Sequence, residues 1–466
     1  MKKKLEKNIG SQTDKSMYSK FKLSNISYLY KRAASREQIV FKDLLTGLGN
    51  RYELIDKINS VLGCGVNSNT KIVLLLIDLG CIQSVNYLMG HRWCDLLIKK
   101  QSVKLKKILK NGDLLVRSGV DEFAILVAGC NDDDSIKIIS DKIIDKLKHP
   151  ISIESNTINL RPSIGIACFP NDANDTDSLL TNAHIALNQS KESGRNSVHF
   201  FNVDMHLSDC KLIKIEQALS LAIENDELSL VFQPKVQLSD SKVVGAEALL
   251  RWSNAELGDV SPSIFIPLAE KSNLIIEIGE WVVIEACKIM NRWKNMGVNI
   301  NRIAINVSVQ QLESKGFSSW LFNIISFYSL SVEDFELEVT ETSLINDEDL
   351  ILEVLRDLSG MGFRIVLDDF GTGYSSLYYL KNLPLSTIKI DQSFIYDMNN
   401  DNATLSIVKT IIQLAKDLNL NLVAEGVEED IQASKLLTLG CEYAQGYLFY
   451  KPLPSNELEK LILVSC

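Results

Sequence analysis

Short apolar segments alternate with amphipathic segments eight times between residue 212 and the end of the chain, and this alternation constrains the fold more than any other feature. The apolar segments, which we interpret as strands, are 229–236, 243–252, 302–309, 335–342, 363–370, 387–392, 421–427 and 443–449. Strands that alternate with helices favour a parallel sheet. Eight such units in roughly 255 residues match the size of a TIM barrel. A doubly wound open sheet is the alternative that the pattern leaves open.

The first part of the chain has a different pattern. Residues 1–35 are polar and rich in Lys and Ser, which predicts a tail with a helix near residues 24–36. The segment 36–202 mixes strands (71–79, 113–128 and 160–169) with helices (93–109 and 134–147), and 203–211 reads as a linker into a further helix. We therefore predict an α/β chain in which an α+β domain, 36–202, precedes a C-terminal TIM-like (β/α)8 barrel, 212–466.

Charge and cysteine usage limit the partners and the compartment. A net charge of −10 and a pI of about 5.2 disfavour direct binding to nucleic acid through bulk electrostatics. The nine cysteines form no CxxC pair, so we expect neither zinc nor a disulfide framework, and a reducing cytoplasm fits. The basic start has no apolar stretch behind it, and no uncharged apolar run is long enough to span a membrane.

Polar residues occur within or near the C-terminal halves of seven of the predicted strands. They are Glu247, Asn306, Glu338, Asp368, Asp369, Lys389, Glu425 and Gln445. Any one of them fits an ordinary solvated strand end, but in a barrel all these ends converge on one mouth, where active sites lie. The pocket would then hold five carboxylates and one ammonium group. The carboxylates repel one another, and divalent cations between them would offset this repulsion.

Oxygen and amide ligands without Cys or His favour hard metals such as magnesium or manganese. Two such ions a few ångströms apart can clamp the attacking and leaving oxygens of a phosphoryl displacement. The adjacent Asp368 and Asp369 can reach two neighbouring ions, provided that the Gly-rich loop after them lets the backbone turn tightly.

The same residues fall within motifs that resemble the EAL family of cyclic di-GMP phosphodiesterases. The motifs are GAEALLRW, INVS, EVTE, DDFGTGYSSL, KID, AEGVE and QGY, in this order along 212–466. The resemblance implies a TIM barrel with one reversed strand, two Mg²⁺ or Mn²⁺ ions, and hydrolysis of cyclic di-GMP to linear pGpG. A non-catalytic cyclic di-GMP receptor or scaffold is an alternative.

The resemblance also implies a role for each matching residue. The metal ligands would be Glu247, Asn306, Glu338, Asp368, Asp369 and Glu425; the catalytic set would be Glu247, Asp369, Lys389, Glu425 and Gln445; substrate would be bound by Arg251, Gln233, Leu249 and Asp391. Lys389 would hold the nucleophilic water or the phosphate, and Gln445 would steady the water network. Glu341 would brace the loop that contains Gly371, Thr372 and Gly373, which links metal binding to the contacts of a homodimer.

Residues 36–202 resemble the GGDEF family of diguanylate cyclases, with a nucleotidyl-cyclase-like fold. The motifs are DLLTGLGNR (43–51), LIDLGCIQSVNYLMGHRWCD (76–95), RSGVDEF (117–123), SIGIA and KESGRN (191–196). The matching site residues are Asp78, Asp121 and Glu122 for metal, Asn86 and Asp95 for guanine, and Lys191 and Arg195 for phosphate. The departures are Val120 for the second Gly of the signature, Gly80 for an Asp, Gln83 for a phosphate-contacting Lys, and Lys110-Asn-Gly-Asp113 for the inhibitory RxxD motif.

These departures predict a degenerate GGDEF domain that is inactive as a cyclase. A β-branched Val120 resists the positive φ or the close approach to phosphate that Gly allows, and Gln83 removes a charge from the polyphosphate site. Whether the domain still binds GTP as a regulatory module is left open, and a bifunctional cyclase and phosphodiesterase is a further alternative.

Overall fold

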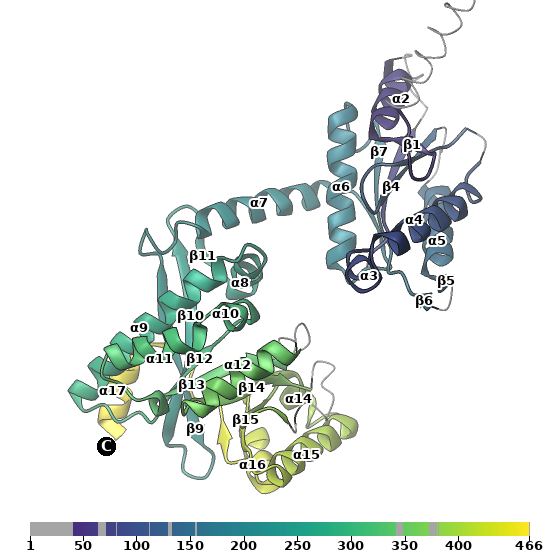
Figure 1. Ribbon diagram of the computed structural model, residues 1–466. Helices are drawn as coiled ribbons and strands as arrows, with labels where there is room; N and C mark the ends of the chain where they lie inside the picture. The colour runs from purple at the N-terminus through teal and green to yellow at the C-terminus, as the bar shows by residue number, and fades with distance from the viewer. Residues whose placement is uncertain are drawn as a thin grey trace, which may run out of the picture. The chain divides into compact units, whose positions relative to one another are not determined.

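The computed structural model describes residues 41–63, 71–80, 82–110, 112–128, 133–153, 156–341, 348–371, 380 and 382–465. The predicted tail and its helix lie outside these residues. The chain divides into two compact units, Met1–Leu212 and Ile213–Cys466, and Figure 1 labels most of their elements. The division falls within helix α7 (Val203–Leu219), so the predicted linker 203–211 is helical. The exact domain limits stay a prediction.

The C-terminal unit consists of alternating strands and helices. Its strands are β9 (Leu228–Gln237), β10 (Val243–Asn254), β11 (Gly258–Val260), β12 (Ile303–Asn306), β13 (Phe335–Thr340), β14 (Arg364–Phe370), β15 (Leu385–Ile390), β16 (Asn421–Ala424), β17 (Tyr443–Ala444) and β18 (Leu453–Pro454). Its helices are α8 (Pro262–Lys271), α9 (Leu274–Met296), α10 (Val309–Glu313), α11 (Phe317–Phe327), η1 (Val332–Asp334), α12 (Glu348–Gly360), α14 (Gln392–Asp397), α15 (Asn402–Asp417), α16 (Asp430–Leu439) and α17 (Ser455–Ser465).

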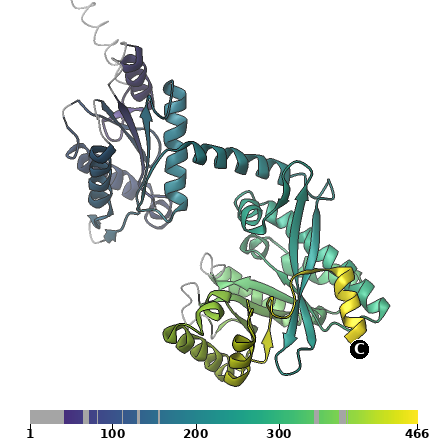
Figure 2. The same ribbon diagram turned by 180° about the vertical axis from the view of Figure 1, so that it is seen from behind.

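Eight of these strands close into a barrel. The order is β9-β10-β12-β13-β14-β15-β16-β17, and β17 pairs again with β9. Strand β9 is antiparallel to both of its neighbours, whereas the other seven run parallel. The predicted TIM-like barrel with one reversed strand is therefore confirmed, and the open sheet is excluded. Figures 1 and 2 show the C-terminal helix α17 beside β9.

The apolar runs of the sequence form the barrel wall and the helices cover it. The strand residues of β12 to β14 bury their outward side chains against α9, α11 and α12, in one core that contains Trp293, Leu321 and Leu355. A second core lies under α15 and α16. Strands β16 and β17 end earlier than predicted, at Ala424 and Ala444. The polar residues that follow them therefore lie just beyond the strand ends, on the rim of the barrel.

The N-terminal unit is an α+β domain. Its strands are β1 (Gly49–Asn50), β2 (Ile72–Asp78), β3 (Leu114–Arg117), β4 (Glu122–Ala128), β5 (Ile151–Ile153), β6 (Asn156–Ile158), β7 (Ser163–Phe169) and β8 (Val198–Phe200). Its helices are α2 (Arg51–Gly63), α3 (Ile82–Met89), α4 (His91–Lys106), α5 (Asp133–Lys148) and α6 (Thr176–Glu192). Six strands form one sheet in the order β1-β3-β4-β2-β7-β8, in which β2 is antiparallel to β4 and β7.

The central strand β2 shows why helices cover both faces of this sheet. All seven of its residues are buried, because odd and even side chains enter different cores. Val73, Leu75 and Ile77 face the core under α4 and α5. Ile72, Leu74 and Leu76 face the core under α2 and α6. None of the helices in the described part of the chain combines the length and the apolar character needed to cross a membrane.

Candidate active site

Acidic side chains from neighbouring strands of the barrel surround one lysine. Lys389, on β15, is 1% exposed. Its Nζ lies 2.6 Å from Glu425 Oε1, 2.9 Å from Glu338 Oε2, 3.1 Å from Asp368 Oδ1 and 3.2 Å from Glu247 Oε2. The parallel strands all end at the same rim, so residues that are up to 178 positions apart in the sequence meet at one ammonium group.

The two adjacent aspartates reach the same place through a local irregularity of β14. Successive side chains of a regular strand point to opposite faces. The pairing of β14 with β15 shifts register here, and Asp369 has a φ of 53°, in the left-handed region. A bulge of this kind re-aims a side chain. Carboxylate oxygens of Asp368, Asp369 and Glu425 consequently lie within 4.8 Å of one another.

Side-chain amides hold Glu247 on both of its oxygens. Asn306 Nδ2 donates to Glu247 Oε1 and Gln445 Nε2 donates to Glu247 Oε2, each at 2.9 Å. Gln445 Nε2 also donates to Gln233 Oε1 at 2.9 Å. The Oε1 atom of Gln445 is buried and has no hydrogen-bond partner among the described residues. This oxygen is available to a water molecule or a ligand donor.

The excess of negative charge perturbs the titration of the cluster. Burial and the neighbouring Glu247 raise the pKa of Glu338 to about 7, and burial raises the pKa of Glu425 to about 8 although Lys389 opposes it. Burial and Asp368 raise the pKa of Asp369 to about 6. Burial would also raise the pKa of Glu247, but the nearby lysines outweigh it and lower that pKa to about 2. A site of this kind favours cations or protons.

The cluster contains two groups of oxygen ligands that could each hold a cation. One group is Glu247, Glu338 and Asp368, and the other is Asp368, Asp369 and Glu425; within each group the ligand atoms lie within 4.8 Å of one another. Asp368 belongs to both groups. All ligands are carboxylates, which suit hard divalent cations such as Mg²⁺ or Mn²⁺. The residues present therefore fit the pair of ions that the sequence implies.

A cavity of about 310 Å³ opens beside this cluster. It is lined by Gln233, Glu247, Leu249, Asp368, Gln392, Glu425, Gly426, Glu428, Gln445, Gly446 and Tyr447. Leu249 also lines a neighbouring, mostly apolar cavity of about 300 Å³, together with Arg251 and Asn306. Asp391, which was predicted to bind substrate, accepts a hydrogen bond from Ser393 N at the start of α14 and is 9% exposed. Asp391 thus caps the N-terminus of α14 beside the cluster.

The loop after β14 is described only at its first residue. Gly371 N donates to Glu341 Oε2 at 2.8 Å, and Glu341 is 2% exposed. Gly371 has a φ of 100°, and a Cβ there would lie 2.7 Å from the Phe394 ring. Thr372 and Gly373 lie outside the described residues. Glu341 therefore contacts the start of the loop that the sequence assigned to it.

A buried lysine of the barrel interior was not predicted from the sequence. Lys235, on β9, is 5% exposed, and its Nζ lies 2.7 Å from Glu338 Oε1 and 3.3 Å from Glu336 Oε2. The carboxylates in the barrel interior are thus accompanied by two buried ammonium groups rather than the one expected. A signal existed in the segment VFQPKV, where a lysine interrupts an apolar strand, but it resembles an ordinary strand end.

In the N-terminal unit, several residues of the predicted nucleotide site lie together. Asp78 Oδ2 lies 2.6 Å from Lys191 Nζ, and Asp78 is paired with Glu122 across β2 and β4. Glu122 Oε1 accepts from Ser118 Oγ at 2.7 Å. The backbone oxygen of Asp121 accepts a hydrogen bond from Leu79 N. Asp95 is exposed on α4. The Oδ1 atom of Asn86 is buried and has no hydrogen-bond partner among the described residues.

Two of the departures from the GGDEF pattern have different structural consequences. Val120 is 74% exposed and does not have a positive φ, so the backbone of this turn does not require glycine. The expected hindrance of Val120 to a close approach of phosphate stays a prediction. The hairpin turn accommodates a side chain because it points to solvent. Gly80, in contrast, has a φ of +63°, and a Cβ there would lie 2.4 Å from Arg161 O and 2.6 Å from Arg195 Nη1. An Asp at this position would collide with the backbone.

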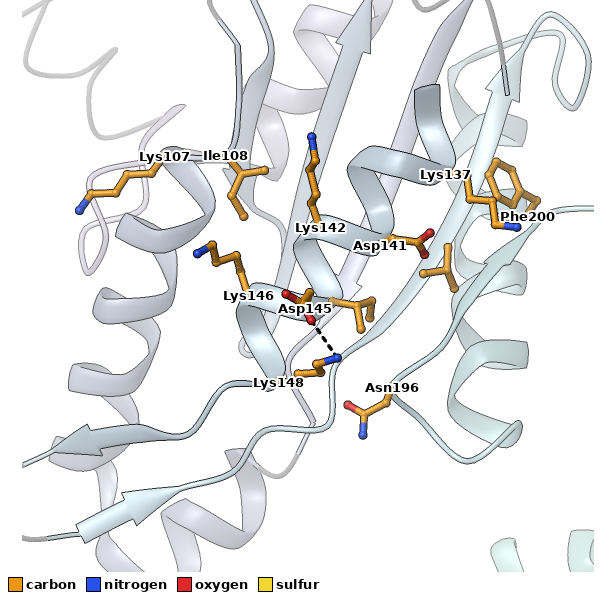
Figure 3. A pocket seen from close by; sticks show the side chains of 12 residues that line it. Lys107, Ile108, Lys137, Asp141, Lys142, Asp145, Lys146, Lys148, Asn196 and Phe200 are labelled. Atoms are coloured by element: carbon orange, nitrogen blue, oxygen red, sulfur yellow. Dashed lines mark ion pairs between the residues drawn. The ribbon is translucent and has the colours of Figure 1, made fainter. Parts of the chain in front are cut away.

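A larger and more open cavity of about 1080 Å³ lies elsewhere in this unit (Figure 3). Its lining comes mainly from α5 and includes Lys137, Lys142, Lys146 and Lys148, and Lys148 forms an ion pair with Asp145. None of the seven residues assigned to nucleotide binding lines it. The predicted nucleotide site and this cavity are therefore different places.

Comparisons with known proteins agree with the division of the chain into two units. The family model of the EAL domain matches residues 216–452, and that of the diguanylate cyclase GGDEF domain matches 40–197. The chain is 37% identical over 427 residues to the bifunctional diguanylate cyclase/cyclic di-GMP phosphodiesterase MucR of Pseudomonas aeruginosa, with 91% of this chain and 62% of MucR covered. It is 35% identical over 430 residues to the cyclic di-GMP phosphodiesterase NbdA of the same organism, with 92% and 55% covered. The chain thus spans less than two thirds of the length of these relatives.

Two solved structures are also similar to parts or most of this chain. The PaMucR phosphodiesterase in its c-di-GMP complex is 43% identical, with a TM-score of 0.51, and the match covers 53% of this chain and 99% of that one. The Vibrio cholerae LapD S helix–GGDEF–EAL structure bound to c-di-GMP covers 91% of this chain and 100% of that one at a TM-score of 0.60. Its 19% identity supports the fold alone.

Proposed function

Because the chain belongs to the EAL domain family and carries a GGDEF domain before its EAL domain, we propose that it is a phosphodiesterase that hydrolyses cyclic di-GMP to linear pGpG. The observation that carries the proposal is the cluster of four carboxylates within 3.2 Å of Lys389 Nζ, beside a cavity at the barrel rim. The similarity to two proteins that are named cyclic di-GMP phosphodiesterases supports the substrate.

The carboxylates would hold two Mg²⁺ or Mn²⁺ ions, with the Asn306 amide as a further ligand. Such ions, when bound, supply Lewis-acid polarisation of a phosphoryl oxygen and a water nucleophile at neutral pH. Burial would lower the pKa of Lys389, but Glu247 and Glu338 outweigh it and raise that pKa well above its usual value. Lys389 Nζ therefore stays protonated and can donate hydrogen bonds to a phosphate oxygen or to the nucleophilic water. Gln445 and Asn306 fix the orientation of Glu247, and the unpaired Gln445 Oε1 can accept from a water molecule.

The substrate would lie across the two adjoining cavities. Gln233 and Leu249 line the cavity beside the carboxylates, and Arg251 lines the apolar one next to it. A guanidinium group suits a phosphate, and the apolar walls suit a base. Asp391 would act indirectly, through Asp369 and the start of α14. We also propose a homodimer in which the loop that Glu341 contacts couples the interface to the metals, and a cytoplasmic location.

The test uses the purified chain with Mg²⁺ or Mn²⁺, given cyclic di-GMP and GTP in separate reactions, with products resolved by chromatography. Linear pGpG from cyclic di-GMP supports the proposal. Binding of cyclic di-GMP without any product would instead identify a receptor or scaffold. We expect Ca²⁺ to bind without supporting turnover, because it accepts more ligands at longer distances, so equal rates in Ca²⁺ and Mg²⁺ would contradict the assigned metal chemistry.

Cyclase activity is the second candidate, since MucR is named as bifunctional. The site keeps Asp78, Glu122 and Lys191 close together, and the unpaired Asn86 Oδ1 is available to a base. Against synthesis stand the missing charge at position 83 and the Gly80 backbone, which has no room for the usual Asp. We therefore propose that the domain binds GTP without converting it. Formation of cyclic di-GMP from GTP in the same assay would overturn this.

A further inference from the structure

A second buried lysine is an unexpected feature of the barrel interior. Lys235 comes from β9, the reversed strand, and none of the proposed metal ligands lies on this strand. A buried charge is costly unless it is paired. Lys235 therefore depends on its carboxylate partners, and the identity of these partners indicates which role the lysine has in the site.

Lys235 contacts only one carboxylate of the proposed metal groups in the part of the chain that the structure describes. Its Nζ lies 2.7 Å from Glu338 Oε1, whereas Lys389 Nζ lies 2.9 Å from the other oxygen, Glu338 Oε2. Glu338 is thus held between two ammonium groups, one on each oxygen. The second partner of Lys235 is Glu336, at 3.3 Å, which lies two residues earlier on β13 and belongs to neither metal group.

This arrangement fixes which way the Glu338 carboxylate is turned. Glu338 Oε2 faces Lys389, which also contacts Glu247 and Asp368, the other two members of its metal group. Those two carboxylates repel Glu338 and favour rotation of its side chain away from them. The ion pair with Lys235 anchors the opposite oxygen and opposes that rotation.

Resting on the proposed phosphodiesterase function, we propose that Lys235 is a positioning residue that orients Glu338 for cation binding. Lys235 does not touch the reacting atoms. It acts through Glu338, so its removal weakens cation binding first and lowers turnover as a consequence. An ion pair that only ties β9 to β13 would affect the stability of the barrel and leave cation affinity unchanged.

The experiment measures Mn²⁺ affinity of the full chain without substrate, from the electron paramagnetic resonance signal of free Mn²⁺. The variants are Lys235→Met, Lys235→Arg and Glu336→Gln, and the matched control is Lys242→Met, whose side chain is 78% exposed at the turn between β9 and β10. We expect Lys235→Met to weaken Mn²⁺ binding at least tenfold and Lys235→Arg to recover part of the loss. Glu336→Gln and Lys242→Met should stay within twofold of the parent protein.

Hydrolysis gives the second readout. The activity lost in Lys235→Met should return in part when Mn²⁺ is raised, because the defect is in cation binding. A folded Lys235→Met variant that binds Mn²⁺ within twofold of the parent protein would overturn the proposal. If Lys235→Met does not fold, the double variant Lys235→Met/Glu336→Gln, which also removes the Glu336 carboxylate that has lost its lysine partner, is judged by the same threshold. A parent protein that binds Mn²⁺ but does not hydrolyse cyclic di-GMP would refute the proposed function and leave the positioning role standing.

Discussion

In the absence of divalent cations, the free energy of unfolding of the barrel should fall as the pH rises. Glu338 is 1% exposed, and burial together with Glu247 raises its pKa from 4.5 to about 7. The folded state then holds a proton that the unfolded state has lost between these two pH values. Protons consequently stabilise the folded, cation-free protein. This stabilisation is fully present below pH 4.5 and is lost as the pH rises through 7.

The magnitude follows from the size of the shift. A shift of about 2.5 units at Glu338 corresponds to roughly 3 kcal/mol of unfolding free energy, most of it lost between pH 5 and pH 8. The raised pKa of Glu425, to about 8, acts in the same direction. Cations that bind the ionised carboxylates should cancel the effect, so Mg²⁺ or Mn²⁺ should stabilise the barrel more at pH 8 than at pH 6.

The assay is urea unfolding in EDTA and in Mg²⁺, across pH 5 to 8, followed by tryptophan fluorescence. Four of the five tryptophans, at positions 252, 281, 293 and 320, belong to the C-terminal unit, so the signal reports mainly on the barrel. The variant Glu338→Gln cannot titrate at this position and should show a smaller pH dependence in EDTA. An unfolding free energy that is constant or rises between pH 6 and pH 8 in EDTA would refute the reasoning.

Three further predictions concern single side chains. Glu247→Gln keeps the shape of the side chain but removes the charge that would hold a cation, so we expect turnover, measured by chromatography of pGpG, to fall by at least about a hundredfold with an unchanged circular dichroism spectrum; activity near that of the parent protein would contradict the metal site. Asp369→Ala should destabilise the barrel by about 1 kcal/mol more than Asp369→Asn in urea unfolding, because Asn tolerates a positive φ better than Ala does; equal stabilities would argue against the bulge. Gly371→Ala should lower the midpoint of thermal unfolding, since φ is 100° and the added Cβ would meet Phe394, and a midpoint equal to that of the parent protein would show that the loop adapts.

The barrel and most of its site were predictable from the sequence because both depend on a period that the chain repeats. Each β/α unit contributes an apolar strand that ends in a polar residue, and parallel strands place these ends on one rim. The convergence of Glu247, Glu338 and Lys389 follows from this repetition without any knowledge of individual contacts.

Features that depend on closure or on a single backbone angle were not predictable in the same way. Lys235 belongs to the reversed strand, and only the closed ring brings it to Glu338, 103 residues later. The family pattern also does not reveal that the turn at Val120 has no positive φ in this chain. The requirement for glycine at position 80 depends on Arg161 O, which comes from a distant segment.

The adjacent aspartates show how a local irregularity completes a site that the repeat alone cannot build. In a regular strand, Asp369 would point away from the barrel interior if Asp368 points into it. The register shift in β14 and the positive φ at Asp369 remove this restriction and bring both carboxylates to Glu425. The tight turn was expected at the glycines of the loop, whereas in the structure the positive φ begins at Asp369 itself. Most residues disfavour the left-handed conformation that Asp369 adopts. This conformation brings the Asp369 carboxylate to Asp368 and Glu425, and the second cation group thereby has three carboxylates.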